Sequence, residues 1–186
     1  MHIMIDRTFI FAGKGLQMLK NLSFLNMFLW NLFIIGVWHL TVFLAGVKLP
    51  HSISQKERYA PKEWEHGGRW YRDKLKIQLW KDRVPQHIGK DGFSKEHLTD
   101  ISIDYVDEFI FETCRGEWVH LKNCICIVVT MLINPFLVGI VFSCLIMLGN
   151  LPFAIIQRYN RFRLQVLRKK LLRDLRANGM GQTVTA

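Results

Sequence analysis

The stretch ETCRGEWVH, from Glu112 to His120, holds the residue types best suited to acid–base chemistry. Glu112 and Arg115 stand three residues apart, and Glu117 and His120 have the same spacing. Each pair can therefore meet on the surface of a helix. A carboxylate beside a histidine fixes the imidazole tautomer and supports the imidazolium, so such a pair can act as a general base. The alternative is an ion-paired helix end that neutralises its own charges where the helix approaches a membrane.

A second histidine, His97, precedes this stretch and is the other candidate base, with a capping or surface role as its alternative. The spacing from Glu117 to His120 also occurs among carboxylate–histidine metal ligands of helix bundles. One such pair without a partner pair is a weak metal signal, and Cys124-x-Cys126 lacks the second pair of a structural zinc site. We expect no bound metal or cofactor, and we interpret the cysteines as small apolar side chains.

A third candidate is the run QRYNR, from Gln157 to Arg161, which follows directly after an apolar segment. Arg158 and Arg161 lie three residues apart, and arginine binds phosphate or carboxylate groups in a bidentate manner. Arginines that extend from a helix end to the membrane surface are the alternative interpretation. Trp70 and Trp80 are interpreted as interfacial anchors, and a stacking surface for a sugar ring is their functional alternative.

These residues need elements to hold them, and half of the 186 residues are hydrophobic. Phe24–Val47 contains no Asp, Glu, Lys or Arg and is long enough to cross a bilayer, whose core takes about 20 residues of helix. Cys124–Ile156 is also free of formal charge but is longer than one span. Asn134-Pro135 interrupts it, and Gly149–Pro152 interrupts it again. We therefore expect an integral membrane protein with about three membrane segments.

Charge is distributed unevenly along the chain, which has 25 Lys and Arg against 15 Asp and Glu and a pI near 9.7. Much of the excess lies in residues 157–186. Positive charge next to a span marks the cytoplasmic side, so we expect a multi-pass cell-membrane protein with a cytoplasmic C-terminus. Basic residues beside a bilayer also attract anionic lipid, and the sequence contains no nucleic-acid-binding motif.

The expected fold is mainly α-helical, with a small polar α+β insertion between the first two membrane segments and a basic amphipathic helix at the C-terminus. A short strand or hairpin is predicted over Trp70–Trp80, where apolar and polar residues partly alternate. The predicted basic helix covers Arg161–Leu175, with leucines along one stripe. The expected divisions are an interfacial amphipathic lead-in (1–23), a transmembrane helix (24–47), a polar insertion (48–119) with the candidate catalytic helix (97–121), a helical membrane hairpin or re-entrant segment (120–156) and a basic cytoplasmic tail (157–186).

The run GNLPFAIIQRYNRFRL resembles the C-terminal signature of the glycosyl-4,4'-diaponeurosporenoate acyltransferase family, the small membrane enzymes that finish staphyloxanthin-type carotenoids. Three further blocks match in the same order: HGGRWY with the following LWKDRVP, the start at His97-Leu98, and ETCRGEWVH. Together they cover roughly residues 65–172. The combination of ETxRxExxH with QRYNR carries the resemblance. The chain departs from the family in a longer N-terminal part and a shorter connection around Asn134-Pro135.

The resemblance implies transfer of a fatty acyl chain from acyl-CoA, or a similar donor used as co-substrate, onto a sugar hydroxyl of a membrane glycolipid or carotenoid glycoside. His120 or His97 would remove the proton from the attacking hydroxyl. Glu117 or Glu112 would orient the imidazole, and Arg115 would stabilise the oxyanion or hold a carboxylate. Arg158 and Arg161 would bind the donor's phosphates, and the full set of predicted substrate-binding residues is Gln157, Arg158, Tyr159, Asn160, Arg161, Arg163, Trp70 and Trp80.

Two other functions stay open at this point. One is a non-enzymatic membrane scaffold or subunit of a lipid-modifying complex, whose polar clusters dock a partner enzyme. The other is a metal-dependent membrane enzyme that uses Glu112, Glu117, His120 and His97. Within the acyltransferase interpretation, direct transfer is favoured because no Gly-x-Ser-x-Gly motif is present, and a Cys114 thioester is the exception. Expected partners are membrane lipid, the glycolipid acceptor and the acyl donor, with an oligomer or partner membrane enzyme left open and no nucleic acid.

Overall fold

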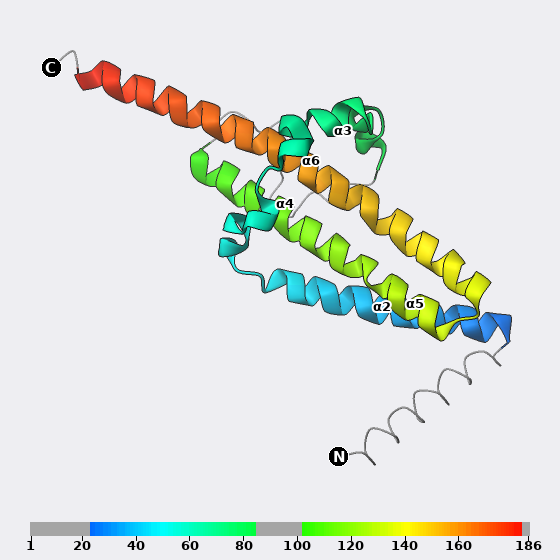
Figure 1. The fold of residues 1–186 in the computed structure, drawn as a ribbon. Coiled ribbons are helices and arrows are strands. Elements are labelled where there is room, and N and C mark those ends of the chain that lie inside the picture. The colour runs from blue at the N-terminus through cyan, green and yellow to red at the C-terminus, as the bar shows by residue number, and fades with distance from the viewer. Residues whose placement is uncertain (1–22, 85–101, 184–186) are drawn as a thin grey trace, which may run out of the picture. The chain divides into compact units, whose positions relative to one another are not determined.

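The computed structural model of the chain describes residues 23–84 and 102–183 (Figure 1). Its α-helices are α2 (Phe24–Val47), α3 (Arg69–Asp73), α4 (Ile103–Cys124), α5 (Cys126–Ile133) and α6 (Phe136–Thr183). Short 3₁₀ helices lie between α2 and α4: η1 (His51–Gln55), η2 (Glu57–Tyr59), η3 (Glu63–Gly68), η4 (Ile77–Leu79) and η5 (Lys81–Arg83). The predicted lead-in over residues 1–23 lies, except for Ser23, outside the described residues.

The chain divides into two compact units. Within the described residues, we call 23–48 and 118–154 the apolar unit, and 49–84, 102–117 and 155–183 the polar unit. Helices α4 and α6 contribute residues to both units.

Three stretches of the described helices are long and apolar enough to cross a membrane: Phe24–Val47, Ile103–Ile133 and Phe136–Ala177. The predicted three membrane segments are therefore confirmed as candidate spans, and α2 has the bounds expected for the first. Phe24 is 76% exposed and Phe33 is 61% exposed, which suits a helix surface that faces lipid. A bilayer core needs about 20 residues of helix. Helix α6 has 48 residues, so part of it extends beyond the apolar layer.

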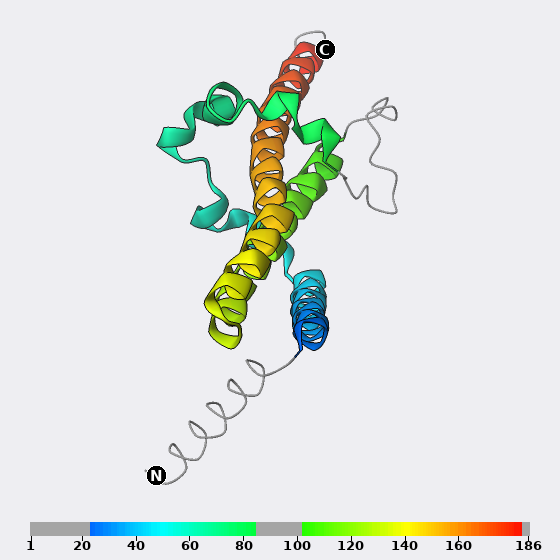
Figure 2. The same cartoon turned by 90° about the vertical axis from the view of Figure 1, so that its right-hand side faces the viewer.

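The turn at Asn134 and Pro135 separates α5 from α6, as the sequence predicted. A residue before proline avoids the helical region, and Asn134 has φ −107° and ψ 160°. The side-chain amides of Asn134 and Asn31 donate to each other at 2.7 Å in both directions. These bonds join the turn to α2, which lies beside α5 and the start of α6 within the apolar unit (Figures 1 and 2).

The Gly149–Pro152 motif, which interrupts the apolar run in the sequence, does not end the helix, because α6 continues through it. Pro152 lacks an amide hydrogen and leaves one intrahelical bond unmade, but membrane helices tolerate proline where neighbouring groups take up the freed backbone. A separate basic amphipathic helix over Arg161–Leu175 is not supported, because these residues continue α6.

The described part of the insertion contains no strand, so the predicted strand or hairpin over Trp70–Trp80 and the α+β description are wrong. This segment instead forms α3 and η4. Left-handed backbone at Gly67 (φ 65°), Gly68 (φ 87°) and Lys76 (φ 49°) turns the chain on both sides of α3. A strand needs φ near −120° to −140°, so these residues cannot continue one.

The apolar residues of this segment pack against α6. Tyr71 and Ile77 join Ile156, Tyr159 and Phe162 in one buried cluster of the polar unit, and Ile77 is 0% exposed. The partial alternation in the sequence thus comes from side chains that reach α6 from a short helix and turns, not from one face of a strand.

Helix α4 begins at Ile103, where the amide of Tyr105 donates to the hydroxyl of Ser102 at 3.1 Å. Ser102 therefore caps the N-terminus of α4. The helix ends at Cys124, slightly beyond the predicted end of the catalytic helix. Residues 97–101 of that predicted helix lie outside the described residues.

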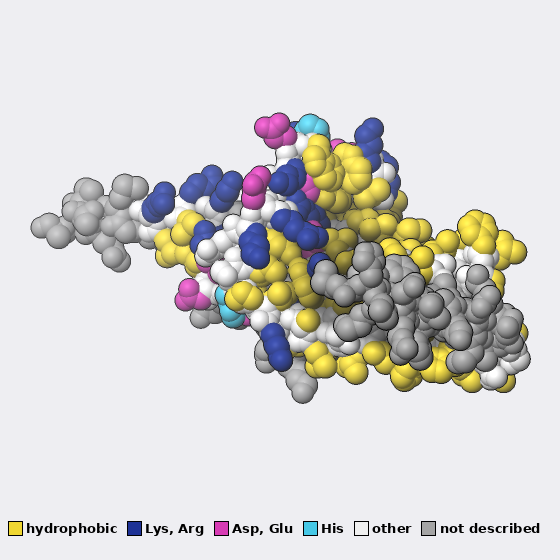
Figure 3. Space-filling model, turned by 60° about the horizontal axis from the view of Figure 1, so that its bottom comes forward, with side chains coloured by type: hydrophobic (Ala, Val, Ile, Leu, Met, Phe, Trp, Pro, Cys, Tyr) yellow, Lys and Arg dark blue, Asp and Glu magenta, His cyan; other side chains and the backbone are white. Residues whose placement is uncertain are grey.

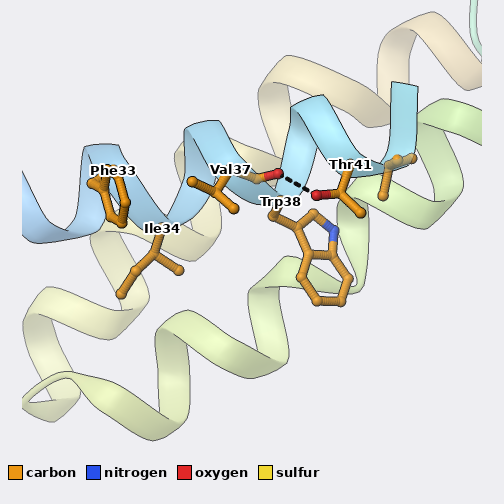
Figure 4. A pocket seen from close by; sticks show the side chains of 6 residues that line it. Phe33, Ile34, Val37, Trp38 and Thr41 are labelled. Carbon is orange, nitrogen blue, oxygen red and sulfur yellow. Dashed lines mark hydrogen bonds between the residues drawn. The ribbon is translucent and has the colours of Figure 1, made fainter. Parts of the chain in front are cut away.

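An apolar groove of about 280 Å³ lies along α2 in the apolar unit (Figure 4). Its lining residues are Phe33, Ile34, Val37, Trp38, Thr41 and Val42. The hydroxyl of Thr41 donates to the carbonyl of Val37 at 2.8 Å. Because the Thr41 hydroxyl is already bonded to this carbonyl, the groove offers a lipid tail mainly dispersion contacts.

Candidate functional site

A fully buried carboxylate, Glu65, lies inside the polar unit. It is 0% exposed, and its two oxygens accept four hydrogen bonds. The hydroxyl of Tyr71 and the backbone amide of Lys62 each donate at 2.6 Å. The guanidinium of Arg158 donates from Nε at 2.8 Å and from Nη2 at 3.0 Å. A buried carboxylate is costly without partners, so these donors are what keep Glu65 ionised.

The guanidinium of Arg158 has further acceptors. It donates to the backbone carbonyls of Arg58 at 2.8 Å and of Ala60 at 2.9 Å. Its Nη1 also lies 3.7 Å from a carboxylate oxygen of Glu117. Arg158 therefore ties α6 to the turns before α3 and to the part of α4 that belongs to the polar unit.

A second buried ion pair lies three residues further along α6. Arg161 is 2% exposed, and its Nη2 donates to the carboxylate of Glu117. Its Nη1 donates to the sulfur of Cys114 at 3.4 Å, and its guanidinium carbon lies 5.1 Å from the ring centre of Tyr59, within cation–π range. We call Glu65, Glu117, Arg158 and Arg161 the buried ion network.

The environment of this network shifts the pKa values of neighbouring groups. Burial alone would raise the pKa of Glu65, but the hydrogen bonds from Arg158, Tyr71 and the Lys62 amide hold it below the ordinary 4.5. Burial and the hydrogen bond to Glu65 raise the pKa of the Tyr71 hydroxyl. Burial also raises the pKa of Tyr59, whose hydroxyl makes no hydrogen bond to the part of the chain that the structure describes. Both phenols are therefore neutral, and that of Tyr71 donates to the ionised carboxylate of Glu65.

The residues of ETCRGEWVH are engaged in different ways. Glu112 and Arg115 meet at 2.6 Å, as their spacing predicted, and the Arg115 guanidinium lies 5.9 Å from the ring centre of Phe111. The carboxylate of Glu117 is held by arginines of α6. The roles predicted for Glu112 and Glu117 in orienting a histidine stay predictions, and His97 lies outside the described residues.

His120 belongs to the apolar unit and is half-buried. Its Nδ1 lies 3.2 Å from the amide oxygen of Asn150. Its ring stacks on that of Phe153, with centroids 5.1 Å apart and planes 17° from parallel. The structure thus fixes both the position and the plane of this imidazole.

The polar residues of QRYNR differ in exposure. Gln157 packs against Gly116 of α4 so closely that an added Cβ there would lie 3.0 Å from the Gln157 side chain. Asn160 is half-buried, whereas Arg163 just beyond the run is exposed. Of these residues, Arg163 is the one whose charge is open to a dissolved or interfacial ligand.

The aromatic candidates lie in the polar unit and are held by specific contacts. Tyr159 is buried, and its hydroxyl accepts from the amide of Gln78 at 3.4 Å. The indole of Trp80 donates to the carbonyl of Leu75 at 2.9 Å. Trp70 makes an edge contact with the ring of Tyr71 at 5.2 Å. The anchor and sugar-stacking roles of the two tryptophans both stay predictions.

Among the described residues, no three His, Cys, Asp or Glu side chains come together in a way that could hold a metal ion. The pair with metal-ligand spacing is engaged elsewhere, since Glu117 binds Arg161 and His120 binds Asn150. The metal-dependent alternative therefore finds no support in these residues.

A family model described as glycosyl-4,4'-diaponeurosporenoate acyltransferase matches residues 55–170, more than half of the chain. The chain belongs to this acyltransferase family. Glycosyl-4,4'-diaponeurosporenoate acyltransferases from Staphylococcus aureus strains MRSA252, bovine RF122 / ET3-1 and USA300 are each 26% identical over 138 residues, which cover 72% of this chain and 81% of each relative. No solved structure matches the chain. The resemblance drawn from the sequence motifs is thus confirmed.

The region matched by the glycosyl-4,4'-diaponeurosporenoate acyltransferase family model contains the whole buried ion network, His120 and Asn150. Glu65, Tyr71 and Asn150 were missed as site residues by sequence reasoning. Glu65 directly precedes HGGRWY, but a single acidic residue beside a motif gave no hint of its distant partner. Asn150 carried a usable signal, because a polar side chain inside an apolar membrane segment is costly unless it has a partner.

Proposed function

We propose that this protein transfers a fatty acyl chain from acyl-CoA or a similar thioester to a sugar hydroxyl of a membrane glycolipid or carotenoid glycoside. The observation that carries the proposal is that three motif blocks of the family resemblance meet in the buried ion network. Arg158 of QRYNR binds Glu65 beside HGGRWY, and Arg161 of QRYNR binds Glu117 of ETCRGEWVH. The printed names of the relatives support both the acyl transfer and the glycosylated carotenoid acceptor.

His120 is the general base in this proposal, and His97 is its alternative. The imidazole takes the proton of the sugar hydroxyl while the hydroxyl oxygen forms a bond to the thioester carbonyl carbon. The carbon–sulfur bond then breaks, and the sulfur leaves as a thiol with the same proton. The reaction needs no covalent acyl-enzyme.

The phosphates of an acyl-CoA donor require cations that solvent can reach. Arg163 is exposed, and so are Lys169, Lys170, Arg173 and Arg176 further along α6. Figure 3 shows Lys and Arg side chains along this part of the helix. We assign the phosphate-binding role to Arg163 and these cations. For Arg158 and Arg161, whose guanidinium groups are occupied by carboxylates, we propose that they hold α6 in place within the polar unit.

The proposed location is the cell membrane, with several spans and a cytoplasmic C-terminus. The basic residues that follow the apolar part of α6 support this orientation, because positive charge next to a span stays on the cytoplasmic side. A cytoplasmic polar unit would also have access to acyl-CoA, which is a water-soluble cytoplasmic donor.

The test uses the full-length protein purified in detergent, labelled long-chain acyl-CoA and a total polar lipid extract. We expect wild type to form a new acylated lipid, whose mass identifies the acceptor. The variant His120→Ala should lose about 10²- to 10⁴-fold in rate, the range that general acid–base catalysis contributes. The matched control is His51→Ala, because His51 lies outside the family match and its side chain is 72% exposed; it should keep the wild-type rate.

A different result would support the scaffold function instead. If wild type transferred no acyl chain from any thioester donor tried, and bound a second membrane protein through the same residues, the chain would be a scaffold of a lipid-modifying complex. A double variant of His97 and His120 would then keep that binding.

A further inference from the structure

In the apolar unit, Asn150 joins two histidines from different helices. Its amide oxygen lies 3.2 Å from Nδ1 of His120 in α4, and its amide nitrogen lies 3.2 Å from Nε2 of His39 in α2. Asn150 itself is 4% exposed and lies on α6. Three helices that contribute to the apolar unit, α2, α4 and α6, therefore meet at one series of side-chain hydrogen bonds.

Two backbone carbonyls determine the direction of every bond in this series. The amide nitrogen of Asn150 also lies 2.9 Å from the carbonyl of Ile146, which can only accept, so the amide orientation is fixed. That nitrogen must then donate to Nε2 of His39. A neutral imidazole with an accepting Nε2 carries its proton on Nδ1, and Nδ1 of His39 lies 2.8 Å from the carbonyl of Ile35. Both hydrogen bonds of His39 therefore require the same tautomer, with the proton on Nδ1.

The bond to Asn150 also determines the tautomer of His120. The amide oxygen of Asn150 has no hydrogen to give, so Nδ1 of His120 must be the donor of their bond. The neutral ring then carries its lone pair on Nε2. Within the residues that the structure describes, Nε2 of His120 makes no hydrogen bond, and the stacked ring of Phe153 holds the imidazole plane.

A second polar contact in the apolar unit shows what a purely structural arrangement looks like. Asn31 and Asn134 donate to each other, and each also donates to a carbonyl of its own helix, Met27 and Thr130 respectively. The two amides thus bond to each other and to nearby backbone carbonyls, and such bonds fasten membrane helices together. The series of hydrogen bonds through Asn150 differs, because it ends at His120, whose Nε2 keeps an unbonded lone pair within the described residues.

We infer that Asn150 and His39 are positioning residues that set His120 in the tautomer required of a general base. The inference rests on the proposed function. Asn150 does for His120 what the third member of a catalytic triad does for its histidine, a role that asparagine fills in Cys-His-Asn proteases. His39 accepts from the Asn150 amide nitrogen and, together with the carbonyl of Ile146, keeps the amide oxygen facing His120. Nε2 can then take the proton of the acceptor hydroxyl, and that proton leaves with the thiol of the donor.

The experiment combines kinetics with heteronuclear NMR of isotope-labelled histidine in the full-length protein. Wild type should show His120 with a protonated Nδ1 and an unprotonated Nε2. Asn150→Ala should mix the two tautomers and lower kcat by about 10- to 100-fold with little change in KM, the range seen when the partner that orients a metal-ligating histidine is removed. His39→Leu should act in the same direction and more weakly, and it keeps the test decisive if Asn150→Ala does not fold.

The matched control is Asn31→Ala, which breaks the other buried amide contact of the same unit. It should lower thermal stability but leave the His120 tautomer and kcat unchanged. A wild-type His120 protonated on Nε2 would overturn the inference, as would a wild-type kcat in both Asn150→Ala and His39→Leu. Absence of acyl transfer by wild type would instead overturn the proposed function, and the NMR spectra would still decide the tautomer on their own.

Discussion

Arg158 binds both carboxylate oxygens of Glu65, a residue 93 positions earlier in the chain, at 2.8 and 3.0 Å. Glu65 is fully buried, and the side chain of Arg158 is 11% exposed. The pair therefore joins α6 to the turns before α3 in a region that water hardly reaches.

Removing one partner of this pair should destabilise the protein strongly, because the other charge remains buried without compensation. We expect Arg158→Ala to lower the free energy of unfolding by about 3–5 kcal/mol. Arg158→Lys should recover only part of this, since lysine cannot donate two parallel hydrogen bonds to one carboxylate. The measurement is unfolding of the detergent-solubilised protein followed by tryptophan fluorescence.

The exposed pair of Arg72 and Asp73 supplies the control for that series. Both side chains are about half exposed, and solvent screens the attraction within exposed ion pairs so that they add little stability. Arg72→Ala should therefore unfold almost as wild type does. Equal losses in Arg72→Ala and Arg158→Ala would contradict the account of a buried pair.

The lowered pKa of Glu65 predicts a pH dependence of stability with a defined sign. A carboxyl whose pKa is lower in the folded state than in the unfolded state stabilises the fold above its unfolded pKa, and this contribution is lost as pH falls through the folded pKa. The loss should thus occur below the ordinary value of 4.5. Thermal midpoints measured from neutral pH downwards should fall less steeply in Glu65→Gln than in wild type. Parallel curves would show that Glu65 is not the group responsible.

The close approach of Gly116 and Gln157 predicts a steric effect of substitution. A Cβ at Gly116 would lie 3.0 to 3.1 Å from three Gln157 side-chain atoms. Gly116→Val should therefore destabilise by about 1–3 kcal/mol, as overpacking usually does. Truncation of the neighbour in Gly116→Val with Gln157→Ala should recover part of the loss, and strictly additive effects in this double-mutant cycle would argue against the contact.

The proposed phosphate role of Arg163 predicts a change in donor binding. Arg163→Ala should raise KM for acyl-CoA several-fold and leave kcat nearly unchanged, because the lost interaction is the same in the ground state and the transition state. Added salt should weaken donor binding by wild type more than by the variant. An unchanged KM and salt dependence would remove Arg163 from the donor site.

The membrane part of the fold could be predicted because its signals are local. Phe24–Val47 is charge-free over a span's length, and Pro135 imposes an extended backbone on Asn134 wherever the chain lies. The strand over Trp70–Trp80 was wrong because two glycines and Lys76 adopt left-handed backbone. These backbone conformations depend on packing against α6, and a period-two pattern in a short segment does not encode that packing.

The candidate site was predicted in part for the same reason. The Glu112–Arg115 pair follows from helix spacing, but the partners of Arg158 and Arg161 come from elements 93 and 44 residues away. Sequence spacing alone left phosphate and carboxylate equally good partners for these arginines. His39 and Asn150 were visible as polar residues in apolar runs, and only the fold brings them to one histidine.

The central claim is that His120 is the base of an acyl transfer. Its most direct test is chemical rescue of His120→Ala by added imidazole, measured as formation of acylated lipid from labelled acyl-CoA. We expect His120→Ala to be nearly inactive and imidazole to restore part of its rate, with no such rescue of Arg158→Ala. A wild-type rate in His120→Ala without imidazole would contradict the claim.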